Sequence, residues 1–547
     1  MHHTANRHLL ACAIALAATG IPPRDLPAQG GGSRPAPRTP RLVVFLTVDQ
    51  MRPDYFTRFG SQLTGGLKRL HDGGAVFTNA WQDHAITETG PGHASTMSGR
   101  FPEHTGIVNN TLGVPDPQAR LITSRDPGAS PFRFRGSTLI DWMRSADPRS
   151  RALSISRKDR GAILPLGRAK QSVFWFATSN AEFTTSTYYG DTLPTWIRDV
   201  NARRVPQRAA GSTWTPSLPD SAYPERDSVP IENGGHNYMF PHTLPDDSTK
   251  LGDEFIVTPA IDALTLDAAL AGLKALDLGR GPAPDLLAVS LSATDYIGHR
   301  YGMDSKEIHD QILRLDRSLG VFLDSLYKLR DSSDVIIALT ADHGASPYPE
   351  LHFPGNDPMR GRADIVPTMT AFKRTLSQLG VDSTAVQFEG GAILFDPHAF
   401  VTAGVNRDSA ARALAVRLRR VPGVAQVDLR GSLAREAAGG NVYARRWLHT
   451  LPADNATVLT VTLRDYFYWA QVHYATHGSP HDADAHVPLI FYGAPFAAGK
   501  YSGFARVVDA APTLAAVLAV APTEPLDGHV LREALRASPR RGKSATP

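Results

Sequence analysis

The chain has 547 residues, of which 42% are hydrophobic and 20% are charged, and its formal net charge is +4. This composition is typical of a globular protein and argues against a disordered or a membrane-spanning chain. The small net charge argues against binding of a nucleic-acid polymer but leaves room for a local anion site.

The N-terminal segment has the pattern of an export signal. A short apolar run at 9–18 follows a basic start and ends in a Gly/Pro break. We expect a signal peptide over 1–28, a disordered lead-in over 29–40, and a periplasmic or secreted protein with no membrane span. A buried helix and lipidation of Cys12 are the alternatives. Cys12 is the only cysteine, so the mature chain has no disulfide or thiolate metal ligand.

Short apolar runs rich in β-branched residues predict buried parallel strands. They cover 42–48, 286–291, 335–340 and 487–492. Helical patterns lie between them, at 258–276 and 308–329. The alternation predicts an α/β fold over 41–535, with a doubly wound, mostly parallel sheet flanked by helices.

Two segments interrupt this alternation, at 171–255 and 365–470. The first is rich in Pro, Gly, Asn and aromatic residues, and we interpret it as an irregular insertion over the sheet edge or the site. In the second, strand patterns at 391–395 and 424–429 flank an Arg-rich helix in a βαβ-like order, which predicts a small α+β cap subdomain. The basic tail at 536–547 is expected to be disordered.

Three of the predicted strands are followed by an acidic residue, namely Asp49, Asp295 and Asp342. In an open parallel sheet, ligands bind in the crevice at the carboxyl ends of the strands, so these carboxylates are expected to converge there. Each one alone is explained as well by a helix cap or a loop.

Histidines near these carboxylates complete a set of candidate metal ligands. Asp295 and His299 are one helical turn apart, His343 directly follows Asp342, and His477 lies in a turn-prone loop. The six candidate ligands are Asp49, Asp295, His299, Asp342, His343 and His477. They suffice for two three-ligand sites that each keep an open position. Two metals ~3.5–4 Å apart would clamp the attacking and leaving oxygens of a displacement at phosphorus.

The segment 87–95 reads Thr-Glu-Thr-Gly-Pro-Gly-His-Ala-Ser, and an Asn-Asn pair follows at 109–110. Together with the six ligands, this pattern resembles the alkaline phosphatase superfamily. The resemblance is to the branch of type I phosphodiesterases, nucleotide pyrophosphatases and PafA-like alkaline phosphatases with a threonine nucleophile. The motifs extend from Asp49 to His486, nearly the whole mature chain.

The resemblance implies a nucleophile and a phosphate-binding amide. The family nucleophile lies two residues before a Pro-Gly-His element, which selects Thr89 over Thr87. The family asparagine lies 21 positions later (110 minus 89), which selects Asn110 over Asn109. The Gly90 N–H and the Asn110 amide would hold the non-bridging phosphoryl oxygens. A threonine cap in a Gly/Pro turn is the alternative.

The segment 156–162 resembles the one by which PafA-like monoesterases place a lysine and an arginine against the transferred phosphoryl group. The match falls on Lys158 and Arg160. A phosphate monoester carries about two charges near neutral pH, so two additional cations favour it over a diester. Diesterases of this branch lack the pair, and a solvated basic loop is the alternative.

The function implied by the resemblance is an alkaline phosphatase that releases phosphate from small-molecule monoesters through a phosphothreonine. Two zinc ions would be bound, one by Asp295, His299 and His477, and the other by Asp49, Asp342, His343 and Thr89. The same N/O ligands would also accept cobalt or manganese. The first alternative is a phosphodiesterase or nucleotide pyrophosphatase that uses the same metals and Thr89. A phosphonate hydrolase, a phosphoglycerate mutase-like enzyme and a catalytically silent anion-binding protein are more distant alternatives.

Overall fold

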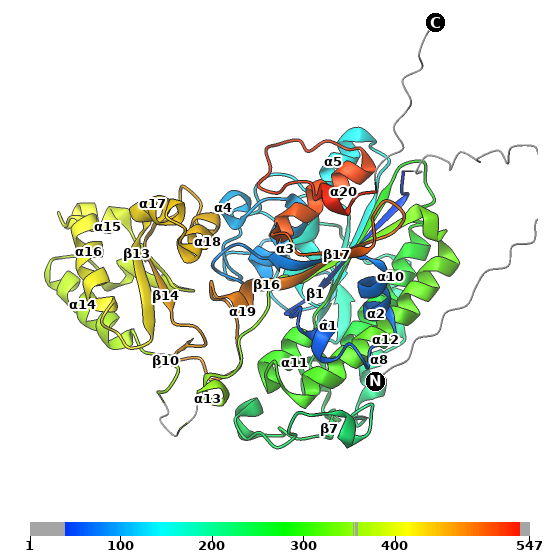
Figure 1. The fold of residues 1–547 in the computed structure, drawn as a ribbon, viewed down its shortest axis with the longest axis horizontal. Helices are drawn as coiled ribbons and strands as arrows, with labels where there is room; N and C mark the ends of the chain where they lie inside the picture. The colour runs from blue at the N-terminus through cyan, green and yellow to red at the C-terminus, as the bar shows by residue number, and fades with distance from the viewer. Residues whose placement is uncertain (1–38, 354, 356–358, 537–547) are drawn as a thin grey trace, which may run out of the picture. The chain divides into compact units, whose positions relative to one another are not determined.

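The computed structural model describes residues 39–353, 355 and 359–536. The predicted signal peptide, almost all of the lead-in and nearly all of the C-terminal tail lie outside the described residues. The main feature is a central sheet with the strand order β17-β2-β16-β9-β1-β8-β3-β4-β5, in which β18 also pairs with β2 (Figure 1). The strands are β1 (Leu42–Val48), β2 (Ala75–Trp81), β3 (Ala152–Ser156), β4 (Ser172–Ala177), β5 (Glu182–Thr184), β8 (Asp285–Leu291), β9 (Val335–Thr340), β16 (His486–Tyr492), β17 (Gly499–Tyr501) and β18 (Ala505–Arg506).

Helices cover both faces of the sheet, as a doubly wound fold requires. One face packs against α2 (Gly66–Gly73), α10 (Ala260–Ala275) and α12 (Lys306–Leu329). The other packs against α3 (Thr89–Ser98), α5 (Leu139–Ala146), α6 (Asp159–Ile163) and α20 (Ala510–Leu518). Strand β1 is fully buried, and its alternate side chains enter the two cores: Leu46 enters the first and Phe45 the second.

The predicted parallel order is confirmed at the centre of the sheet, where β1 runs parallel to β8 and β9, and β3 runs parallel to β8. The prediction was wrong for 487–492, because β16 runs antiparallel to both β9 and β2. The reason is its connection. The loop that carries His477 leads through α19 (Asp482–Ala485) directly into β16, so this strand starts at the edge where β9 ends.

The segment 171–255 begins as part of the sheet rather than as an insertion. Strand β4 runs parallel to β3, and β5 runs antiparallel to β4. The rest contains α7 (Thr195–Ala202), α8 (Val205–Ala209), β6 (Thr213–Trp214), β7 (His242–Thr243) and α9 (Ser248–Phe255). Trp196 packs edge-on against Phe174 of β4 at 5.2 Å between ring centroids. This aromatic side chain therefore contributes to the packing of the sheet face.

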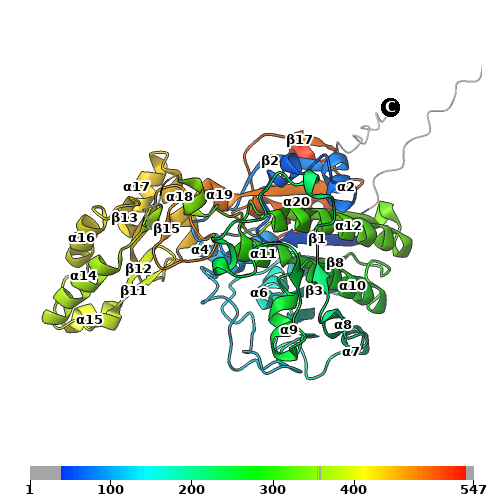
Figure 2. The same cartoon turned by 90° about the horizontal axis from the view of Figure 1, so that it is seen from below.

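The segment 365–470, called the cap from here on, has its own sheet and its own core. The sheet order is β11-β12-β14-β13, and Figure 1 shows α14, α15 and α16 on the far side of that sheet from the central one, whereas α18 lies on the near side (Figure 2 gives the view from below). The strands are β11 (Val386–Glu389), β12 (Ala392–Phe395), β13 (Val424–Leu429) and β14 (Thr457–Leu463). The helices are α14 (Val366–Gln378), α15 (Pro397–Thr402), α16 (Arg407–Leu418), α17 (Leu433–Ala438) and α18 (Val442–Thr450).

Strands β12 and β13 each run antiparallel to β14, so they are parallel to each other with β14 inserted between them. This is a split version of the predicted βαβ-like order. The chain enters and leaves the cap at a short parallel pair, β10 (Arg362–Ala363) and β15 (Tyr468–Trp469).

Within the described part of the chain, no single helix has both the length and the apolar character needed to cross a membrane. The helices α9 and α10, bent by 82° relative to each other, pass that test only as a pair.

Candidate active site

The predicted site residues lie at one edge of the central sheet, where the strands β2, β9, β1, β8 and β3 end. Asp49 directly follows β1, and Asp342 with His343 follows β9 after Ala341. Asp295 and His299 are on α11 (Ala293–Tyr301), the helix that follows β8. Thr89 is the first residue of α3, after β2, and Lys158 precedes α6, after β3. The loop with His477 comes to the same edge before β16.

The first group of candidate metal ligands contains Asp295, His299 and His477, whose ligand atoms lie within 4.8 Å of one another. The Oδ1 atom of Asp295 is 3.2 Å from His299 Nε2 and 3.5 Å from His477 Nε2. The two imidazole Nε2 atoms are 3.2 Å apart. The three donors therefore face one point.

The second group contains Asp49, Asp342 and His343, all fully buried. His343 Nε2 lies 3.5 Å from Asp49 Oδ1 and 3.7 Å from Asp342 Oδ2. Among the described residues, neither His343 Nε2 nor Asp49 Oδ1 has a hydrogen-bond partner. The His343 ring stacks on the His477 ring at 3.6 Å between centroids, so the two groups are direct neighbours.

Each histidine of these groups turns its Nδ1 atom to a backbone carbonyl. The Nδ1–H of His299 donates to Ala475 O at 2.6 Å, that of His477 to Thr87 O at 2.7 Å, and that of His343 to Gly344 O at 2.9 Å. This arrangement leaves the lone pair of every Nε2 atom pointing into the site, as in metal-binding histidines. Two such lone pairs at 3.2 Å repel each other unless a cation lies between them, so the residues fit a metal.

The buried carboxylates of the site lie close together, so cations bound there would stabilise their charged forms. Burial raises the pKa of Asp49 well above its ordinary value, and repulsion from Asp295 and Asp342 raises it further. Burial also lowers the pKa of His343 to about 3, which keeps this imidazole neutral. Neutral imidazoles and carboxylates are the N/O donors that zinc takes.

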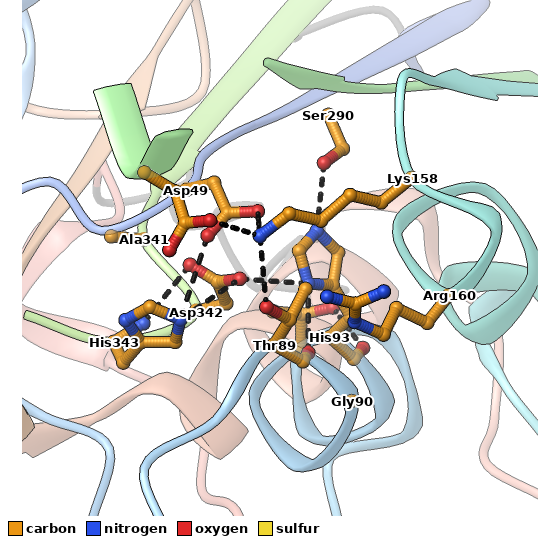
Figure 3. Close-up of polar contacts among 12 residues, drawn as sticks. Asp49, Thr89, Gly90, His93, Lys158, Arg160, Ser290, Ala341, Asp342 and His343 are labelled. Carbon is orange, nitrogen blue, oxygen red and sulfur yellow. Dashed lines mark hydrogen bonds and ion pairs between the residues drawn. The ribbon is translucent and has the colours of Figure 1, made fainter. Parts of the chain in front are cut away.

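Thr89 is buried at the N-terminus of α3, where unpaired backbone N–H groups favour negative charge. Gly92, in the next turn, has no room for a side chain, because a Cβ atom there would lie 2.1 Å from Asp342 O. The glycine therefore allows α3 to approach the second ligand group. Figure 3 shows Thr89 beside Asp342 and Lys158.

Lys158 is the cation closest to Thr89. Its Nζ atom lies 3.1 Å from Thr89 Oγ1, 2.7 Å from Asp49 Oδ2 and 2.5 Å from Asp295 Oδ2. Burial would lower the pKa of Lys158, but attraction to Asp295 and Asp49 outweighs it and raises the pKa. The ammonium group therefore stays charged between the nucleophile candidate and both ligand groups.

Arg160 and Asn110 complete the predicted set. Arg160 extends from the same segment as Lys158 (Figure 3). Its guanidinium is 3.4 Å from its neighbour Asp159, and its Nε has no hydrogen-bond partner in the part of the chain that the structure describes. Asn110 Oδ1 accepts a hydrogen bond from the Gly90 N–H at 2.8 Å. The structure thus places the two predicted oxyanion donors, Gly90 N–H and the Asn110 amide, side by side.

Two further residues of the site were not singled out by the sequence. His93 Nδ1 is 3.0 Å from Thr89 O and 3.1 Å from Asp342 Oδ2, and its Nε2 is 2.9 Å from Ser290 Oγ. Gln50 Nε2 donates to Asp295 Oδ1 at 3.1 Å. The position of His93 one turn after Thr89 was a usable signal, whereas nothing in the sequence marks Gln50.

The fold and the site agree with the comparison to known protein families. The model of type I phosphodiesterases and nucleotide pyrophosphatases matches residues 43–387, more than half of the chain, and the chain belongs to this family. Within it, the relatives described next are alkaline phosphatases of the PafA-like branch. The chain is thus a metal-dependent, phosphatase-type hydrolase.

The chain is 30% identical to alkaline phosphatase PhoK of Sphingomonas over 524 residues, which cover 90% of this chain and 91% of PhoK. It is 29% identical to alkaline phosphatase PafA of Elizabethkingia meningoseptica, covering 88% of this chain and 92% of PafA. The crystal structure of wild-type PafA superposes with a TM-score of 0.83 at 27% identity, over 91% of this chain and 99% of PafA.

Proposed function

We propose that this phosphatase hydrolyses phosphate monoesters through a covalent intermediate on Thr89, with two zinc ions in the two ligand groups. The position of Lys158 carries the proposal, because its Nζ atom contacts Thr89 Oγ1 and a carboxylate of each group. A cation at this point serves both to activate the hydroxyl and to bind the transferred phosphoryl group.

Thr89 is the proposed nucleophile. Its Oγ1 atom attacks phosphorus, and the bond from phosphorus to the oxygen of the leaving group breaks. Water then attacks the phosphothreonine, which releases inorganic phosphate and restores the hydroxyl. The hydrogen bond from Lys158 and the N-terminus of α3 both stabilise the alkoxide form of Thr89.

The proposed oxyanion donors are Gly90 N–H, Asn110, Lys158 and Arg160. They would donate to the oxygens of a phosphoryl group bound at Thr89, and positioning of this kind supplies most of the catalysis of a loose transition state. A solved variant of PafA carries substitutions of a threonine, an asparagine, a lysine and an arginine. The first two are 21 positions apart there and the last two are two apart, as Thr89 and Asn110, and Lys158 and Arg160, are here.

The ligand set supports zinc as the metal. Asp295, His299 and His477 would hold one ion, and Asp49, Asp342, His343 and Thr89 the other. When bound, the ions would supply Lewis-acid stabilisation of the oxygens that enter and leave phosphorus. The predicted signal peptide would direct export, so we place the protein in the periplasm or the medium.

The second candidate is a phosphodiesterase, which the family description favours. A diester has one charge on the transferred group and a bulky second substituent, so it has less use for two additional cations. Lys158 and Arg160 therefore favour the monoester.

A paired assay tests the proposal. The purified, zinc-loaded protein is given 4-nitrophenyl phosphate and bis(4-nitrophenyl) phosphate, and phosphate and nitrophenol release are measured. We expect the monoester to have a kcat/KM at least about 100-fold higher. Trapping at low pH, followed by mass spectrometry, should place the phosphoryl group on Thr89. A preference for the diester would support the second candidate, and no turnover of either would indicate an anion-binding protein.

A further inference from the structure

The loop 82–88, which joins β2 to α3 and ends next to Thr89, is held at its two ends by the segments that carry Asp342 and His477. At its start, Gln82 Nε2 donates to Ala341 O at 2.9 Å, one residue before Asp342. Near its end, Thr87 Oγ1 donates to Ser479 O at 2.8 Å, and Thr87 O accepts from His477. The middle of the loop, residues 83–86, instead contacts the cap.

Asp83 forms the polar part of this contact. It is 1% exposed, and its carboxylate accepts hydrogen bonds from Arg445 Nη2 at 2.8 Å and from Arg445 Nε at 3.1 Å. His449 Nδ1 is 2.6 Å from Asp83 O and 3.4 Å from its carboxylate. Both partners are on helix α18 of the cap. A buried, multiply bonded carboxylate of this kind fixes the backbone that carries it.

An apolar contact and a backbone hydrogen bond reinforce the pairing. Ala85 and Ile86 belong to a small buried cluster with Trp447 of α18. The Ala85 N–H donates to Thr450 Oγ1, also on α18, at 2.7 Å. Loop residues 83–86 are therefore packed into the cap, although they precede the nucleophile by only a few positions.

Helix α18 also contacts the chain beyond the other end of α3. The His449 ring stacks on Phe101, which follows α3, at 3.9 Å between centroids and 7° between planes. In addition, α18 contacts α4 (Pro102–Thr105). One helix of the cap thus braces the segments before and after the helix whose first residue is Thr89.

We propose that Asp83 is a positioning residue, through which α18 of the cap holds the loop 82–88 so that Thr89 is aligned for attack on phosphorus. The inference rests on the proposed function of Thr89. Displacement of a reacting group by about 1 Å costs about 10²-fold in rate, and Asp83 lies six positions before Thr89 (89 minus 83). Asp83 itself contacts none of the predicted ligands, but the loop bonds His477 through Thr87 O, so the zinc content is measured to separate an effect on Thr89 from an effect on metal binding.

The test is Asp83→Asn, which keeps the shape of the side chain and removes its charge. The zinc content, KM, kcat and the single-turnover rate of Thr89 phosphorylation are measured on the full chain. We expect the phosphorylation rate and kcat to fall about 10- to 100-fold, with zinc content unchanged and KM within about threefold. Asp454→Asn is the matched control. It breaks another ion pair between the cap and the rest of the chain, with Arg135, at an exposed position, and should change kcat by less than about twofold.

A second variant keeps the proposal open to refutation if Asp83→Asn does not fold. Thr450→Val removes the acceptor of the Ala85 N–H with little change in volume, and should lower the phosphorylation rate about three- to tenfold. The proposal would be overturned if folded Asp83→Asn formed phosphothreonine at the wild-type rate and only its melting temperature fell. If Asp83→Asn does not fold, the same result for Thr450→Val would overturn it. Failure of the wild-type chain to form phosphothreonine would instead refute the proposed function.

Discussion

The catalytic floor and the cap reach Thr89 in different ways. The floor consists of residues at the carboxyl ends of β1, β8 and β9, and the sheet makes neighbours of side chains that are far apart in the sequence, such as Asp49, Asp295 and Asp342. The cap has its own core, and its α18 contacts the loop before Thr89 together with residues of β12 and α17. In the proposed mechanism, the floor therefore binds the metals, whereas the cap affects how the nucleophile Thr89 is placed.

The largest effect is expected at the proposed nucleophile itself. Thr89→Ala should lower kcat at least about 10³-fold and abolish the covalent intermediate, because no hydroxyl remains to attack phosphorus. Thr89→Ser is the matched control and should retain measurable turnover and a phosphoserine. Steady-state kinetics and intact-protein mass spectrometry check both. Wild-type-like rates for Thr89→Ala would refute the assignment of Thr89 as the nucleophile.

Removal of the metals should lower the activity nearly as strongly as Thr89→Ala. Dialysis against a chelator is expected to lower activity at least about 100-fold, and zinc should restore it. The melting temperature should also fall, because three buried carboxylates then face one another with Lys158 as the nearest cation. Activity that persists in metal-free protein would contradict the two-metal proposal.

Substitution of Lys158 or Arg160, which follow β3, should affect monoesters and diesters differently. Lys158→Ala and Arg160→Ala are expected to lower kcat/KM for a monoester about 10²- to 10³-fold, and for a matched diester less than about tenfold, since the diester has one charge fewer on the transferred group. The two substrates are compared on the same preparations. Equal losses on both would mean that the pair is structural.

Two buried leucines compare the two regions directly. Leu46 of β1 lies three residues before Asp49, and Leu414 lies in the core of the cap; both are fully buried. Each change to Ala should lower the free energy of unfolding by about 2–5 kcal/mol. We expect kcat to fall at least about tenfold for Leu46→Ala and less than about threefold for Leu414→Ala, as measured by denaturant titration and initial rates. Equal losses of kcat would remove the distinction between floor and cap.

The smallest effect concerns the pH dependence of the contact between the loop and the cap. Burial would raise the pKa of Asp83, but hydrogen bonds from His449 and Arg445 outweigh it and lower the pKa below its ordinary value. This stabilisation is present above the unfolded-state pKa near 4 and is lost as the pH falls through the lower folded-state value. In metal-free protein, the stability difference between wild type and Asp83→Asn should therefore be present at pH 5 and shrink as the pH falls below about 4. An equal difference at every pH would contradict the charge-based explanation.

Local sequence patterns predicted the elements that carry the site, because strand and helix periods are local properties. The buried runs before Asp49 and Asp342 are strands, and the spacing of Asp295 and His299 places them on one helix. The direction of β16 was not predictable in this way. An apolar run has the same pattern in either direction, and only the connection from His477 sets the edge at which it enters the sheet.

The sequence by itself determined the α/β architecture and the candidate metal-ligand residue types, because these follow from periodicity and side-chain chemistry, and its motif around Thr89 carried the family resemblance that implies a nucleophile. Tertiary structure alone decided that Lys158 contacts both ligand groups, that His93 joins α3 to Asp342, and that Asp83 pairs with α18. Such contacts join segments up to several hundred residues apart, and burial gives them their strength. A sequence pattern records neither the pairing nor the burial.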